Sequence, residues 1–125
     1  MRISRIVTSV DGGSRFDDLE VALDSGLTGM PSLIASAPWP VHDITYLQTS
    51  AAANDAVAGW HTAPDPRLIV CLAGRSRQET SDGDAREFGP GEMFLTCDTD
   101  GIGHRTVNTG DDVRFLIARL AGPLS

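Results

Sequence analysis

The sequence predicts an all-β domain, built as a barrel or sandwich of short strands. Its 125 residues are enough for one domain with a real core but not for two. Short segments rich in β-branched and aliphatic residues recur along the chain, each bounded by Gly, Asp or Pro. Strands at such regular spacing are typical of barrels and sandwiches. We therefore expect a single domain over residues 1–125.

The first 40 residues are expected to form an N-terminal arm, and residues 41–125 are expected to form the barrel. Within the arm, residues 16–23 carry apolar side chains at mixed spacings, so that a helix and a strand are both possible there. Gly26, Gly29 and Pro31 then interrupt any long element.

The barrel strands are predicted from the apolar segments and the turns between them. They are expected at residues 44–48, 67–72, 76–80, 85–88, 93–97 and 113–120. Gly74 is expected to end the second of these segments. Asp82-Gly83 is a strong hairpin signal between the third and the fourth. Pro90-Gly91 fits a type II turn, in which the glycine supplies the positive φ.

The charge balance argues against several classes of partner. The chain has 17 Asp and Glu against 10 basic residues, all of them arginine, for a net charge of −7. Phosphate backbones bind clustered basic residues, so no nucleic-acid partner is expected. No apolar run approaches the roughly 20 residues that span a bilayer, and residues 1–10 lack the apolar segment of a secretory signal. A cytoplasmic location away from membranes is therefore expected, with Cys71 and Cys97 as reduced thiols.

Two stretches of the chain resemble the two motifs of the cupin family. In the first, His61 fits the first histidine and Gly74 fits the closing glycine. In the second, the turn at residues 89–92 (Gly-Pro-Gly-Glu) and the stretch from His104 to Asn108 match well. The resemblance covers residues 59–120, about half of the chain. It implies a small single-domain cupin, a double-stranded β-helix (jelly-roll) barrel with both histidines at one mouth.

The metal-binding part of the first motif is degenerate. Ala63 stands where the second histidine belongs, and Arg67 stands where the glutamate belongs. A catalytic first-row metal generally needs about three protein ligands and an open position, whereas His61 and His104 supply two. Arg67 also brings a permanent positive charge. No metal or other cofactor is therefore favoured. The alternative is a divalent metal on the two histidines, completed by His42, Asp43, Tyr46 or Asp98.

His61, His104 and Arg67 are the catalytic candidates. An imidazole changes its charge near cytoplasmic pH, so either histidine can act as an acid or a base. Strand alternation places Arg67, Ile69 and Cys71 on one face. If that face lines the pocket, Arg67 would hold a carboxylate, enolate or phenolate oxygen. At the rim it would instead pair with an acid such as Asp65 or Glu92.

Further residues are candidates for substrate binding. Tyr46 and Gln48 share a strand face, Trp60 lies beside the expected mouth, Cys71 shares the face of Arg67, and Thr106 shares the face of His104. For Tyr46 and Trp60 the alternative is packing in the core or at an interface.

Together these residues predict a small-molecule enzyme that uses acid–base chemistry in a barrel pocket. The reaction would be of isomerase, cyclase or lyase type, in bacterial metabolite biosynthesis. His104 or His61 would move a proton, and Arg67 would stabilise the developing oxyanion. The alternatives are a metal-dependent cupin enzyme, dioxygenase-like or lyase-like, and a non-catalytic cupin that binds a small molecule. A homodimer is also expected, because strand edges need cover and the arm can supply it.

Overall fold

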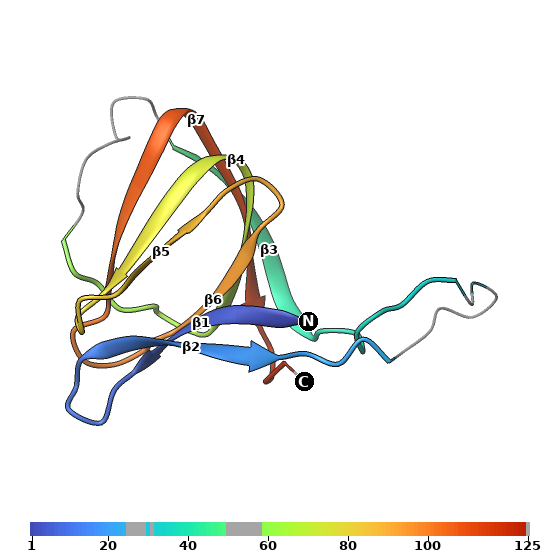
Figure 1. The fold of residues 1–125 in the computed structure, drawn as a ribbon, viewed down its shortest axis with the longest axis horizontal. Helices are drawn as coiled ribbons and strands as arrows, with labels where there is room; N and C mark the ends of the chain where they lie inside the picture. Colours follow the sequence, from blue (N-terminus) through green and yellow to red (C-terminus); the bar gives the residue numbers. More distant parts are fainter. Residues whose placement is uncertain (25–29, 31, 50–58, 125) are drawn as a thin grey trace.

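The computed structural model describes residues 1–24, 30, 32–49 and 59–124, and all the regular secondary structure in these ranges is β (Figure 1). The strands are β1 (Arg2–Thr8), β2 (Ser14–Glu20), β3 (Val41–Thr49), β4 (Arg67–Thr80), β5 (Ala85–Phe88), β6 (Met93–Cys97) and β7 (His104–Leu120). They form one sheet in the order β2-β1-β6-β4-β7-β3, with β5 paired to β4. The predicted all-β fold is confirmed.

The long strands β4 and β7 are the centre of the barrel. They pair antiparallel along most of their length, from Arg67 opposite Arg119 to Thr80 opposite His104. Both strands curve strongly, so the sheet wraps around an interior (Figure 1). The β4–β5 hairpin closes at Gly83, whose φ is 90°, as the Asp-Gly signal predicts.

The expectation that Gly74 ends a strand is wrong, because β4 continues through it to Thr80. The register between β4 and β7 shifts on both sides of Ala73, which marks a bulge. Gly74 has a φ of 74°, and a Cβ there would lie 2.6 Å from Cγ2 of Val113. Glycine thus lets the strand bend at this point instead of stopping.

The expected boundary of the N-terminal arm also needs correction. The segment that could have been a helix forms strand β2, which pairs with β1, and β1 pairs in parallel with β6. Ile3 and Ile6 of β1 are fully buried, so these strands belong to the barrel. Parallel pairing with a strand some 90 residues later is a long-range contact that leaves no local pattern. Among the described residues, part of the segment between β2 and β3 extends away from the barrel (Figure 1).

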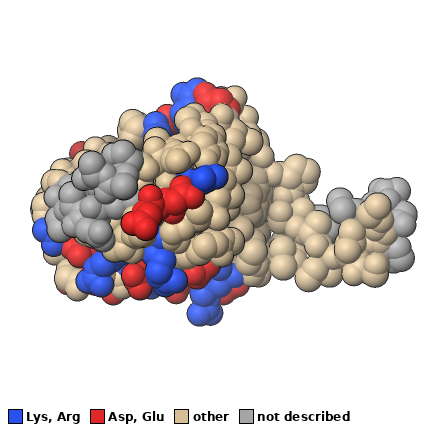
Figure 2. Space-filling model, turned by 90° about the horizontal axis from the view of Figure 1, so that it is seen from above, with Lys and Arg blue, Asp and Glu red and all other residues tan. Residues whose placement is uncertain are grey.

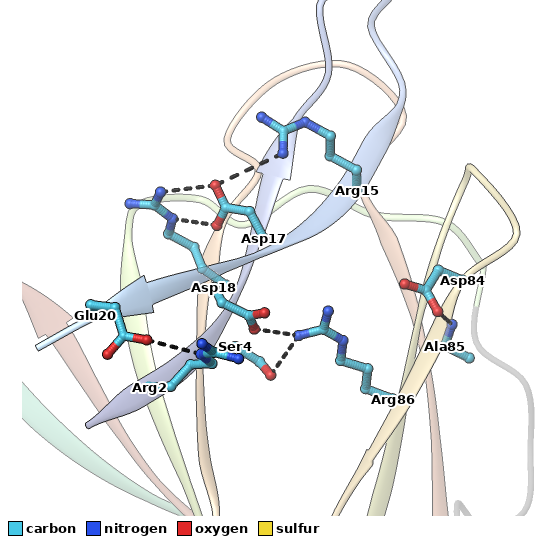
Figure 3. A network of polar contacts seen from close by, with 10 residues as sticks. Arg2, Ser4, Arg15, Asp17, Asp18, Glu20, Asp84, Ala85 and Arg86 are labelled. Carbon is cyan, nitrogen blue, oxygen red and sulfur yellow. Dashed lines mark hydrogen bonds and ion pairs between the residues drawn. The ribbon is translucent and has the colours of Figure 1, made fainter.

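Charged side chains lie on both faces of the β1–β2 hairpin (Figure 3). Arg5 and Asp17 lie opposite each other and form two hydrogen bonds, at 2.8 and 2.9 Å. Arg86 of β5 reaches across to Ser4 and Asp18. The Arg86 contacts tie β5 to the hairpin, while the Arg5–Asp17 pair joins β1 to β2 on the opposite face.

The barrel core includes two clusters of buried apolar side chains. One contains Ile3, Val21, Leu68, Leu95, Ala118 and Leu124, and the other contains Cys71, Val113 and Phe115. Cys71 and Cys97 are both free thiols. In the part of the chain that the structure describes, no helix is long and apolar enough to cross a membrane.

Candidate functional site

A cavity of about 210 Å³ opens into the interior of the barrel, and residues of both long strands, β4 and β7, line it. Residues far apart in the sequence line it, because β4, β6, β7 and the segment before β4 converge there. Its polar lining consists of His61, Thr62, Arg67, Ser76, Gln78, Thr96, His104, Thr106 and Asn108. Its apolar lining consists of Leu47, Ala63, Pro64, Ile69, Phe94, Phe115 and Ile117.

His61 and His104 lie side by side at one end of the cavity. Their backbones form an isolated antiparallel bridge, in which each amide donates to the other's carbonyl, at 2.9 and 2.8 Å. Their ring centroids are 4.4 Å apart. Gly103 permits this bridge, since it has a φ of 82° and a Cβ on it would lie 2.0 Å from the carbonyl oxygen of His61. The sequence-based expectation of two neighbouring imidazoles therefore agrees with the geometry.

Asp98 holds the ring of His104 from behind. Its Oδ2 lies 2.6 Å from Nδ1 of His104, and the two side chains are 0% and 6% exposed. Asp98 follows β6 directly, and its carbonyl accepts a hydrogen bond from the amide of Ala63. A carboxylate on one ring nitrogen fixes the proton there, which leaves Nε2 of His104 as the nitrogen that can exchange a proton with a ligand. The other carboxylate oxygen, Oδ1, is buried with no partner among the described residues.

The sequence left two placements open for Arg67, in the pocket or at the rim beside an acidic residue, and the structure combines them. It lines the cavity, and its Nε also donates to Oδ1 of Asp65 at 2.7 Å. Arg119 approaches the same carboxylate at 3.7 Å and pairs with Asp43 as well. The Arg119 guanidinium lowers the pKa of Asp43 below its usual value. These charges line a second hollow of about 450 Å³ that shares Leu47 and Arg67 with the cavity.

A ladder of uncharged polar side chains forms the wall between the histidines and the bulge. Ser76 and Gln78 of β4 lie opposite Asn108 and Thr106 of β7. Thr106 donates to Oε1 of Gln78 at 2.8 Å, and Nε2 of Gln78 donates to Oγ of Ser76 at 2.7 Å. Oδ1 of Asn108 is buried without a partner among the described residues.

Sequence reasoning missed most of this ladder, although the signal is present. In residues 75–79, charged side chains alternate with Ser76 and Gln78, which separates an outer charged face from an inner neutral one. The bulge at Gly74 shifts the alternation, so even-numbered residues face inward after it and odd-numbered ones before it. Thr106, the one member that was expected to bind substrate, lines the cavity.

The other expected substrate-binding residues lie outside the cavity lining. Tyr46 and Gln48 flank Leu47, which takes the inward position on β3, so both point to the opposite face. Trp60 is 41% exposed and stacks under the guanidinium of Arg105. Cys71 is fully buried in the core cluster with Val113 and Phe115, and this burial raises the pKa of its thiol.

The residues of the cavity do not fit a first-row metal. The described residues hold no group of three His, Cys, Asp or Glu side chains in reach of one ion. Ala63 and Arg67 line the wall at the positions where the family has ligands. Asp98, one of the residues considered for a shifted site, is engaged with Nδ1 of His104. The donor set is thus two imidazoles, short of the usual three ligands.

Comparisons with known proteins leave the function open. No protein-family model and no curated protein matches the chain. Among solved structures, it is similar to protein NMB1881 from Neisseria meningitidis, with 17% identity and a TM-score of 0.48 over 62% of this chain and 72% of that one. It is similar to the SPY1581 protein of unknown function from Streptococcus pyogenes, with 15% identity and a TM-score of 0.47. That match spans 64% of this chain and 65% of the other, just under two thirds.

A third solved structure is similar over nearly the full length. This is a putative ethanolamine utilization protein Q from Salmonella typhimurium LT2, with 15% identity and a TM-score of 0.43 over 98% of both chains. None of these likenesses bears on function, which has to be argued from the cavity itself.

Proposed function

We propose that the protein is a small-molecule enzyme that moves a proton next to a carbonyl group inside the barrel. The observation that supports this most is the buried pair of Asp98 and His104, with the imidazole on the cavity wall and the carboxylate behind it. A buried carboxylate that orients a histidine is a recurring arrangement for general acid–base catalysis. Isomerases, cyclases and lyases of this kind all begin with such a proton transfer.

In the proposed step, Nε2 of His104 takes a proton from a carbon beside the substrate carbonyl. The electron pair of the broken C–H bond moves onto the carbonyl oxygen and forms an enolate. His104 is then an imidazolium whose charge the Asp98 carboxylate stabilises. Return of the proton to a different carbon completes an isomerisation, and loss of a leaving group completes an elimination.

His61 and Arg67 have supporting roles in this proposal. Nδ1 of His61 contacts the carbonyl oxygen of Gly59 at 3.0 Å, an arrangement that leaves its Nε2 as a second proton acceptor in the cavity. Arg67 carries guanidinium donors suited to an enolate oxygen. Asp65 holds Nε of Arg67 and fixes the orientation of the group.

The apolar half of the cavity supports the same chemistry. Phe94 and Phe115 are 1% and 5% exposed, and Ile117 packs beside them. A wall of this kind excludes water from a bound substrate, which strengthens electrostatic interactions with the developing charge.

Solvent exchange tests the proposal without knowledge of the natural substrate. Acetylacetone, cyclohexane-1,3-dione and pyruvate are incubated with the protein in deuterium oxide, and loss of the C–H signal is followed by proton NMR. We expect faster exchange of at least one probe with the wild-type protein than with His104→Ala. His42→Ala, which changes an exposed histidine on β3, is the matched control and should exchange like the wild type.

Equal rates for wild type and His104→Ala with every probe would overturn the proposal. Binding of a probe without exchange would instead support a non-catalytic binding domain. If exchange requires an added divalent metal and stops on chelation, the metal-dependent alternative replaces the proposed mechanism.

A further inference from the structure

Ser76 and Asn108 present a free donor and a free acceptor side by side on the cavity wall. They are cross-strand partners on β4 and β7, and both line the cavity. Ser76 is fully buried, and its Oγ accepts the hydrogen bond from Gln78. No acceptor for the Ser76 hydroxyl proton, and no donor for Oδ1 of Asn108, is found among the described residues.

Leaving buried polar atoms without partners is costly, typically about 1–3 kcal/mol for each group. Such atoms are expected to find a partner, and those facing a cavity find it in a ligand or a water molecule. A group that both donates and accepts satisfies Ser76 and Asn108 together. A hydroxyl group has this property, because its proton reaches Asn108 while its oxygen accepts from Ser76.

The rest of the cavity lining indicates what kind of molecule bears this hydroxyl group. Beyond the polar ladder, the cavity is lined by Ile69, Phe94, Phe115 and Ile117, which offer only apolar contact. A cavity of about 150 Å³ holds benzene, so the 210 Å³ here accommodates a ring with one or two substituents. The ligand is therefore amphipathic, with an apolar body and a polar edge.

The charges at the cavity favour a neutral ligand. Arg67, the one arginine that lines the described part of the cavity, is already paired with Asp65 at 2.7 Å. The chain as a whole carries a net charge of −7, which repels anions. A carboxylate or phosphate ester would thus find no uncompensated arginine here.

We infer that the cavity binds a small, uncharged and mostly apolar ring compound through a hydroxyl group held between Ser76 and Asn108. This deepens the proposed function by naming its substrate class. It rests on the proposed function only in taking the same cavity as the binding site. The ring carbonyl of such a substrate would lie toward His104, which is four residues before Asn108 on β7 and on the same face.

Three probes of nearly equal size test this inference in titrations followed by calorimetry or by amide NMR shifts. They are p-cresol, which has the hydroxyl group, toluene, which lacks it, and benzoate, which is charged. We expect p-cresol to bind roughly tenfold more tightly than toluene, the gain for about one net hydrogen bond. Benzoate should bind more weakly than p-cresol.

Asn108→Leu should remove the preference for p-cresol over toluene. Gln48→Leu, which makes the same change from amide to aliphatic on the exposed face of β3, should leave it intact. If circular dichroism shows that Asn108→Leu does not fold, Ser76→Ala takes its place, and the same loss of preference is expected.

Equal affinities for p-cresol and toluene, or tightest binding of benzoate, would overturn the inference. A preference that persists in Asn108→Leu would also contradict it. The result is separable from the proposed reaction, because binding of p-cresol needs no proton transfer. Selective binding of p-cresol without deuterium exchange would support the ligand class and contradict the proposed reaction. Deuterium exchange without selective binding would support the reaction and contradict the ligand class.

Discussion

Asp98 and His104 form a hydrogen bond of 2.6 Å between Oδ2 and Nδ1, buried behind the wall of the barrel cavity. Five residues separate them in the chain, and Gly103 immediately before the histidine allows the backbone to approach His61. The pair therefore depends on one tight loop between β6 and β7.

Asp98→Asn is expected to slow the proposed deuterium exchange by a factor of about 10²–10⁴, the range for loss of a group that orients a general base. The asparagine no longer stabilises the imidazolium. It also lets the ring adopt the other tautomer, which histidine ring ¹⁵N NMR detects. Asp100→Asn, an exposed change in the same loop, is the control. Unchanged exchange and an unchanged ring spectrum in Asp98→Asn would contradict the role of Asp98.

Gly103→Ala is expected to destabilise the protein by more than about 3 kcal/mol, or to prevent folding. Backbone strain at a positive φ costs about 1–3 kcal/mol, and the added Cβ would also lie 2.0 Å from the carbonyl oxygen of His61. Gly83→Ala is the matched comparison, since its φ is 90° and nothing lies near the new Cβ. The backbone strain alone should lower its free energy of unfolding, by about 1 kcal/mol. Denaturant unfolding measures both, and equal losses would rule out the close approach.

Acid should weaken the pairing of β1 with β2 at Arg5 and Asp17. Hydrogen bonds from Arg5 lower the pKa of Asp17 below its usual 3.8. A carboxyl group with a lowered pKa stabilises the fold above the unfolded value, and the stabilisation is lost as the pH falls through the folded value. Asp17→Asn should therefore cost about 1 kcal/mol or less at pH 7, since the pair is partly exposed, and this cost should shrink as the pH falls below the usual pKa of 3.8.

Denaturant unfolding of Asp17→Asn over this pH range, beside wild type, checks the expectation. Asp111→Asn, an exposed aspartate in β7 with no ion pair among the described residues, should match the wild type at every pH. A deficit in Asp17→Asn that stays constant down to pH 2 would show that the carboxylate charge is not its cause.

We predict that two chains associate through the arm between β2 and β3. The described part of this arm extends from the barrel and carries no charged side chain between residues 30 and 41 (Figure 2). Ile34 on it is 74% exposed. Strand β3 is the last strand in the order of the sheet, so one of its edges has no paired strand among those described. Ile44 on β3 is 63% exposed. The arm of a second copy would cover this edge.

Sedimentation velocity measures the association directly. Wild type should sediment as a dimer of 13.3 kDa chains, and Ile34→Glu should shift it toward monomer. Val10→Glu, at an even more exposed apolar residue in the β1–β2 turn, should have no effect. A wild-type monomer at all concentrations would reject the dimer.

Local sequence patterns were sufficient for much of the barrel. The hairpin at Asp82-Gly83, strand β5 and strand β6 lie where the turn residues predict them, because these features depend on a few neighbouring φ angles. The neighbouring positions of His61 and His104 also follow from the family resemblance. Both histidines and Arg67 line one cavity, as the motif positions suggest.

Which face each residue takes was decided by the tertiary structure. The bulge at Gly74 reverses the alternation in β4 and brings Ser76 and Gln78 inward, while the pairing of β3 with β7 turns Tyr46 outward. Likewise, only the return of the chain after β6 brings Asp98 to His104. A period-two pattern indicates which residues share a face, but long-range strand pairing determines whether that face is inside.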